Sequence, residues 1–222
     1  MNPANPSLSA ASRAGLFVIL ALVMLATRVN HFGALPDASW AVFFIAGFYL
    51  SSAGGGAATM RTSLLRGRPD SSARWAFPLL MALAVLIDFF VITGQGIDFW
   101  SHYCVSPAYL FLLPSYAAPW LGVAWLHRRY RGLHVRELGL LAGSAVVAAS
   151  VCFLISNGSF YWISANVPAR SMAGWLENLG DWYLPYLRTT LVYVGIAAAL
   201  HAGTVLAARE PGRGRTRADA RS

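Results

Sequence analysis

The chain has 222 residues, of which 57% are hydrophobic and only 12% are charged. An average soluble domain is roughly half apolar and about a quarter charged, so the composition excludes a disordered chain and argues against a water-soluble globule. The two cysteines are too few for a disulfide scaffold, and no Cys/His group has the spacing of a zinc finger.

Six stretches are apolar over about the 20 residues that a membrane-spanning helix needs. They cover residues 10–29, 37–58, 75–93, 106–126, 138–156 and 182–207. The sequence therefore predicts an all-α integral membrane protein with one six-helix domain over residues 10–209. Residues 1–9 and the basic segment 210–222 lack apolar periodicity and are predicted to be disordered tails.

The positions of the arginines predict the orientation of the bundle. All 17 basic residues are arginines and the net charge is +8. Fourteen of them lie on one side of the predicted spans, and only Arg28, Arg170 and Arg188 belong to the other side. Because cytoplasmic loops carry the basic excess, we expect both termini inside. The basic balance is then a topology signal and predicts no nucleic-acid partner.

The three loops on the other side, residues 28–36, 94–105 and 157–181, hold most of the aromatic residues that lie outside the spans, together with the chemically interesting polar ones. Three helices are expected to begin at this face, with N-caps at Asp37, at Ser106 before Pro107, and at Asp181. Helix N-termini favour carbonyl and phosphate oxygens. This face is therefore the candidate ligand face.

Two charges are expected deeper in the spans at this face. Asp88 and Arg188 each lie about six or seven residues below its surface, roughly 10 Å at 1.5 Å per residue. Because a charge in a span is costly, these side chains should pair or face a wet cavity. Two interpretations stay open: a salt bridge between helices, or a role in ligand binding.

Cys104 precedes the expected N-cap of the fourth span by two positions, where the helix dipole is expected to lower the pKa of a thiol. Three interpretations stay open for it. The thiol can act as a nucleophile or soft metal ligand. It can be a small packed residue, or it can form a disulfide with Cys152 in an oxidising periplasm.

Two runs of sequence resemble a known family. Residues 35–49 read LPDASWAVFFIAGFY and residues 103–116 read YCVSPAYLFLLPSY. Both are similar to BtuM, a family of bacterial vitamin B12 transporters related to the substrate-binding components of energy-coupling-factor (ECF) transporters. The resemblance covers mainly residues 28–126, and the six-span plan extends it to the whole chain.

The resemblance implies a multi-pass protein of the bacterial inner membrane that binds cobalamin in a cavity at the periplasmic face, capped by the outward loops. It places the family's cobalt-ligating cysteine on Cys104, which is expected to bind the corrin cobalt and to displace an axial ligand such as cyanide. Tyr103 and Tyr109 are expected to line the same cavity. Further candidates for contacts to cobalamin are Arg28, His31, Asp37, Asp88, Asn157, Tyr161, Trp162 and Arg188. The histidines His31 and His102 are alternative cobalt ligands.

The chain has no Walker A motif of its own. Import could be powered by an ECF coupling module, a membrane scaffold with ATPases, or could proceed without one, and both stay open. Two other functions compete with cobalamin uptake. They are a periplasm-facing thiol or redox enzyme that uses Cys104 with Cys152, and a non-catalytic membrane assembly subunit.

Overall fold

The computed structural model describes residues 9–29, 36–50, 71–127, 129–130 and 132–209. Its described part contains six α-helices and two short 3-10 turns, and no strand. The helices are α1 (Ala10–Val29), α2 (Ser39–Leu50), α4 (Ser71–Gly94), α5 (Leu112–His127), α6 (Val135–Ile163) and α7 (Met172–Arg209). The 3-10 turns η2 (Phe99–Ser101) and η3 (Pro107–Phe111) lie between α4 and α5.

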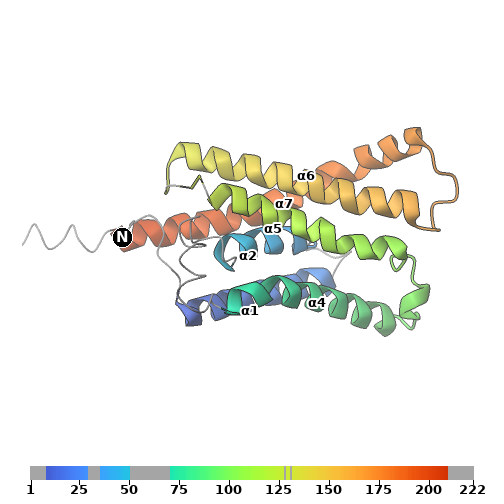
Figure 1. Cartoon of the computed structure of the whole chain (residues 1–222), viewed down its shortest axis with the longest axis horizontal. Helices are drawn as coiled ribbons and strands as arrows, with labels where there is room; N and C mark the ends of the chain where they lie inside the picture. The colour runs from blue at the N-terminus through green and yellow to red at the C-terminus, as the bar shows by residue number, and fades with distance from the viewer. Residues whose placement is uncertain (1–8, 30–35, 51–70, 128, 131, 210–222) are drawn as a thin grey trace, which may run out of the picture.

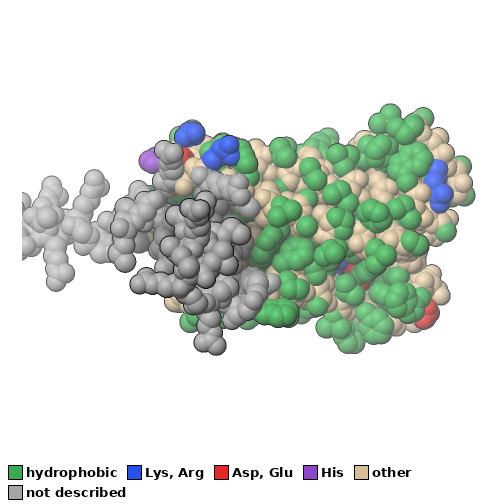
Figure 2. Space-filling view, viewed as in Figure 1, with side chains coloured by type: hydrophobic (Ala, Val, Ile, Leu, Met, Phe, Trp, Pro, Cys, Tyr) green, Lys and Arg blue, Asp and Glu red, His purple; other side chains and the backbone are tan. Residues whose placement is uncertain are grey.

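The helices run along the long axis of the molecule, and successive helices run in opposite directions (Figure 1). At one end α1, α4 and α6 finish, and α2, η3 and α7 begin. We call this the Cys104 end, because the connection from α4 to η3 contains that residue. The opposite end, where α2, α5 and α7 finish, is called the His201 end. The charged side chains visible in Figure 2 lie mostly near the two ends, and apolar side chains cover much of the surface between them.

Each of the six predicted spans contains a helix. In the described part of the chain, α1, α4, α6 and α7 are long and apolar enough to cross a membrane, whereas α2 has 12 described residues and α5 has 16. The fold is therefore that of a helical membrane protein. The presence of six spans and the location of both termini on the cytoplasmic side remain predictions. The predicted tails at 1–9 and 210–222 lie outside the described residues, except for Ser9.

The prediction of a third loop over residues 157–181 is wrong for most of these residues. Helix α6 continues to Ile163 and α7 begins at Met172, so only residues 164–171 are not helical. Asp181 consequently lies inside α7 and is not an N-cap. The hydroxyl of Tyr161 donates to the Ser171 carbonyl at 3.1 Å and accepts from the Ser171 amide at 3.2 Å, which closes this helical hairpin.

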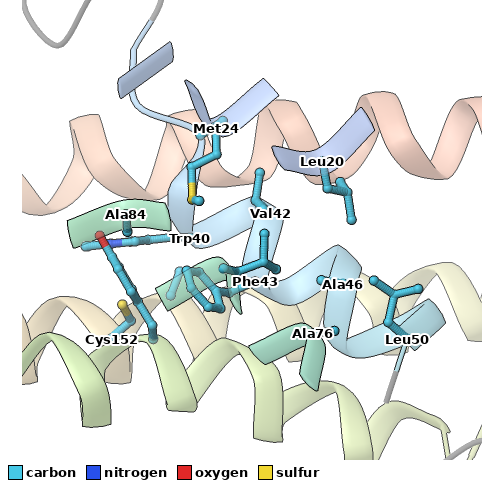
Figure 3. Packing of buried hydrophobic residues seen from close by; sticks show 14 of the residues in the cluster. Leu20, Met24, Trp40, Val42, Phe43, Ala46, Leu50, Ala76, Ala84 and Cys152 are labelled. Atoms are coloured by element: carbon cyan, nitrogen blue, oxygen red, sulfur yellow. The ribbon is translucent and has the colours of Figure 1, made fainter. Parts of the chain in front are cut away.

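Helix α2 is the centre of the bundle. Nine of its 12 residues are buried, and it contacts α1, α4, α5, α6 and α7. A helix that is apolar all round has no solvent face and must be covered on every side. Trp40 and Phe43 of α2 lie with Met24 of α1 and Cys152 of α6 in the largest buried cluster (Figure 3). The stacked rings of Phe43 and Tyr116 extend this cluster to α5.

Small residues let the helices approach closely at two points. A Cβ on Gly47 would lie 3.1 Å from the carbonyl oxygen of Trp120, so α2 and α5 touch through their backbones. A Cβ on Gly122 would lie 2.9 Å from the Cβ of Ala148, between α5 and α6. Close packing at small residues is a main source of helix association in membranes, where lipid is as apolar as the helix surface.

The contact between Gly122 and Ala148 leads to a prediction about stability. Gly122→Ala should lower the free energy of unfolding in detergent by about 1–3 kcal/mol, because overpacking a fixed contact forces the helices apart. Adding Ala148→Gly removes the opposing methyl group and should restore much of the loss. Thermal unfolding followed by circular dichroism measures both variants. A double variant no more stable than Gly122→Ala would show that the two methyl groups do not clash.

Candidate functional site

A buried arginine lies at the centre of the Cys104 end. Arg28, in the last turn of α1, is 7% exposed, and all three of its side-chain nitrogens donate hydrogen bonds. Its Nε and Nη2 bind the two carboxylate oxygens of Asp88 in α4 at 2.6 and 2.7 Å. This bidentate geometry is the strongest form of an arginine–carboxylate pair.

The third nitrogen connects α1 to two further helices. Nη1 of Arg28 donates to Asp37 at 3.1 Å, to the Ser39 hydroxyl at 3.0 Å and to the Tyr116 hydroxyl at 2.8 Å. Asp37 in turn accepts hydrogen bonds from the backbone amide and hydroxyl of Ser39 at the start of α2. Asp37 therefore binds the first residue of α2, but it lies one residue before the N-cap position that was predicted for it, because α2 begins at Ser39 and the Ala38 carbonyl accepts the first helical hydrogen bond.

Tyr109 brings η3 into the same arrangement. Its hydroxyl donates to Oδ2 of Asp88 at 2.7 Å. We call the six residues Arg28, Asp37, Ser39, Asp88, Tyr109 and Tyr116 the Arg28 network. It joins α1, α2, α4, η3 and α5, and each of its charged groups is at most 19% exposed. Removing one partner of a buried ion pair leaves a charge uncompensated, which costs about 3–5 kcal/mol.

Asp88 does not pair with Arg188. Their similar predicted depth in the membrane made a salt bridge between them one of the two open interpretations, but the structure pairs Asp88 with Arg28. Arg188 is an exposed residue of α7, and within the described residues it makes no salt bridge. Matching depth in the membrane does not place two side chains on facing sides of their helices.

Cys104 lies in the connection between α4 and α5, two residues before Ser106. Ser106 is the N-cap position and Pro107 occupies the first turn, as predicted. The element that follows is the five-residue turn η3, however, and the Ser106 side chain makes no capping bond. The residue Cys104 is exposed, and its backbone amide donates to Nδ1 of His102 at 3.3 Å. The turn that follows Cys104 is therefore too short to act on the thiol as the dipole of a long helix would.

This environment reverses the expected effect on acidity. Burial of the Cys104 side chain among its neighbours raises the pKa of the thiol, and a hydrogen bond from Tyr103 lowers it in part. The charge of Asp88 raises the pKa of the thiol and the charge of Arg28 lowers it, and both effects are smaller than that of burial. The same hydrogen bond, together with burial, raises the pKa of Tyr103 to about 12. The thiol thus keeps its proton at neutral pH.

The residues predicted in the third loop have structural partners. Oδ1 of Asn157 accepts from the indole of Trp175 at 3.2 Å, and Nδ2 of Asn157 donates to Asn178 at 2.6 Å. Tyr161 binds Ser171, and Trp162 packs edge-on against Trp175. These side chains hold α6 against the start of α7, and their described contacts do not include the Arg28 network or Cys104.

Sequence reasoning missed the contact that joins the third connection to the second. Nδ2 of Asn166 donates to the backbone carbonyl of Tyr103 at 2.8 Å, next to Cys104. It also missed Ser39 and Tyr116 in the Arg28 network. Tyr116 could have been found, because it follows Tyr109 by seven residues, two helical turns along one face. Nothing in the sequence distinguishes Asn166 from other loop asparagines.

The second cysteine is not next to solvent. Cys152 is fully buried in α6 within the central cluster, and both cysteines are free thiols. His31 lies outside the described residues. Within the described residues, no group of three or more His, Cys, Asp or Glu side chains is placed to hold a metal ion.

Comparisons of the sequence with protein-family models and with curated proteins gave no match. The chemistry of the Cys104 end therefore has to be judged from its own residues.

The Arg28 network predicts which arginine supports the fold. Arg28→Gln should lower the free energy of unfolding in detergent by about 3–5 kcal/mol, because Asp37 and Asp88 lose their buried counter-charge. Arg188→Gln is the matched control and should change it by less than about 0.5 kcal/mol, as an exposed substitution normally does. Thermal unfolding measures both. Equal losses in the two variants would contradict the pairing in the structure.

The raised pKa of Cys104 predicts slow alkylation at neutral pH. Since the thiolate is the reacting form, the rate with iodoacetamide in a Cys152→Ala background should be below that of a free cysteine at pH 7.5 and should rise steadily above pH 9. Tyr103→Phe removes the hydrogen bond that lowers this pKa, so the rate at a given pH should fall further. A faster rate in Tyr103→Phe would show that the hydroxyl does not stabilise the thiolate.

Proposed function

We propose that this protein binds cobalamin at the Cys104 end of its helical bundle and takes part in cobalamin uptake across the bacterial inner membrane. The observation that carries the proposal is a single exposed thiol at the same end of the bundle as the buried Arg28 network. The sequence run around Cys104 and Tyr109, which resembles the BtuM family, supports the same ligand.

A single thiol fits cobalt that arrives inside a corrin. A bare metal ion takes several ligands from a protein, whereas the corrin ring supplies the equatorial donors and leaves only axial positions. One soft, polarizable sulfur is then sufficient. The connection between α4 and α5 offers Cys104 in this way, with Tyr103 beside it and Asn166 fastening the backbone from the third connection.

The protonated thiol suggests how an axial cyanide would leave. The sulfur of Cys104 forms a bond to Co(III) as the cobalt–cyanide bond breaks, and the thiol proton leaves with cyanide as HCN. The oxidation state of cobalt does not change, so no reductant is needed. Coordination to the metal favours loss of the proton, which overcomes the raised pKa of the free thiol.

The Arg28 network gives this site a rigid base. Tyr109 lies five residues after Cys104 and is held by Asp88, which is held by Arg28. The backbone of η3 is therefore fixed relative to α1 and α4, and the residues before it are anchored on one side. Asp88, Arg28 and Asp37 act in this proposal mainly by positioning η3 and its neighbours.

Import also needs an energy source. The chain itself carries no Walker A motif. An ECF coupling module and a route without one both stay compatible with the proposal, and uptake measured with and without such a module separates them.

Absorption spectroscopy tests the proposed cobalt ligation. Detergent-purified protein incubated with cyanocobalamin and passed through a gel-filtration column should carry the corrin at a ratio of about one, with a spectrum shifted from that of the free vitamin. Cys104→Ala should lose the shift and the release of one HCN per corrin bound. Cys152→Ala is the matched control and should keep both.

Two results would contradict the proposal at different levels. Failure of the wild-type protein to retain cobalamin would remove the proposed ligand. Retention with the same spectrum in wild type and Cys104→Ala would keep the ligand and remove the cobalt–sulfur bond. Growth of a B12-dependent strain that lacks its own importer then tests uptake separately from binding.

A further inference from the structure

A partly open cavity of about 60 Å³ lies at the His201 end, the opposite end of the bundle from Cys104. It is lined by α2, the connection between α5 and α6, the start of α6 and the second half of α7. Most of its lining is aliphatic or aromatic, and Glu137 and His201 are among its few ionisable residues. Nothing in the proposed cobalamin function uses this cavity.

Glu137 is the carboxyl group in the lining of the cavity. The residue is 4% exposed, and its Oε2 atom is buried without a hydrogen-bond partner. Buried polar atoms are nearly always paired, and an unpaired buried carboxylate is especially unfavourable. Glu137 lies in the first turn of α6, at the positive end of the helix dipole. Within the described part of the chain, its Oε2 atom has no partner.

Aromatic rings form the facing wall. The ring of Phe48 lies 4.9 Å from that of Tyr49 and 5.5 Å from that of Tyr130, in edge-to-face geometry. The hydroxyls of Tyr49 and Tyr130 bind the two ring nitrogens of His201 at 2.8 and 3.2 Å. His201 is therefore occupied as a hydrogen-bonding residue, and it fixes the wall.

From this geometry we propose that the cavity is a binding site for a small organic cation of the alkylammonium class. The carboxylate of Glu137 is the counter-ion, and the rings of Phe48, Tyr49 and Tyr130 supply cation–π contacts, which are strongest in desolvated sites. On the measure in which one water needs about 10–15 Å³, the cavity has room for about four to six waters. A cation of about five non-hydrogen atoms fits this space.

The lining favours an organic cation over a metal ion. Magnesium and calcium ions take six or more oxygen ligands, and the described part of the chain offers one carboxylate here and no cluster of three metal-binding side chains. An alkylammonium ion needs only one anionic partner and can place its carbon atoms against the aliphatic and aromatic lining. Cation binding in this cavity does not depend on cobalamin binding at the other end of the bundle.

Tetramethylammonium is a suitable probe, with tert-butanol as its neutral counterpart of the same heavy-atom number. Thermal unfolding of the full chain in detergent is followed while each is titrated, with sodium chloride at matched ionic strength as reference. We expect a saturable rise in Tm with tetramethylammonium only, since a ligand that binds the folded state stabilises it. Glu137→Gln should weaken the apparent affinity about ten- to a hundredfold, the range for a lost charged partner.

The control variant is Glu177→Gln, which removes an exposed carboxylate of α7 and should bind like the wild type. A second variant, Phe48→Leu, keeps the charge and removes one ring; it should weaken binding severalfold and serves if Glu137→Gln does not fold. The proposal is overturned if tetramethylammonium stabilises the wild type no more than sodium chloride or tert-butanol does. It is equally overturned if Glu137→Gln, or Phe48→Leu in its place, binds as tightly as the wild type.

Discussion

The guanidinium of Arg28 has to be neutralised inside the bundle, and this requirement determines how the helices meet at the Cys104 end. A charge at this depth is costly unless every donor finds an acceptor. Asp88 of α4 is a bidentate partner, and Asp37, just before α2, accepts one further hydrogen bond from Nη1. Tyr109 and Tyr116 then complete the shell from η3 and α5. The relative positions of these elements follow from one side chain.

Helix α2 connects this polar end to the other end of the protein. Its first residue, Ser39, belongs to the Arg28 network, and Tyr49, near its last described turn, binds His201. Between them the helix is apolar on every side and is covered by its neighbours. The close approach of Gly47 to the backbone of Trp120 fixes its distance from α5. The middle of α2 has no polar side chain. The polar side chains at its two ends therefore make their hydrogen bonds at the ends of the bundle, and none is buried between them.

Hydropathy predicted where the helices lie, because a membrane helix is selected for apolar length and its sequence records that directly. It failed for residues 157–181, whose polar side chains, such as Asn157, hold two helices together instead of forming a loop. It gave the depth of Asp88 but not its partner, since the direction of a side chain around the helix axis depends on packing. The motif predicts that Tyr109 lines a cavity with Cys104, and the structure shows only its hydrogen bond to Asp88. The burial of Arg28 depends on four other elements and has no local signal in the sequence.

The charges of the Arg28 network do not cancel: two carboxylates face one guanidinium. The remaining negative charge is stabilised by neutral donors, namely the Tyr109 hydroxyl on Asp88 and the Ser39 amide and hydroxyl on Asp37. The start of α2 adds the positive end of its dipole at Asp37. The Arg28 network therefore has no surplus positive charge that would stabilise a thiolate at Cys104. Asp88 and Arg28 act on the pKa of the Cys104 thiol in opposite directions, and burial is the largest influence on it. A thiol in such a place remains protonated until a stronger electrophile than the proton, such as a metal centre, replaces it.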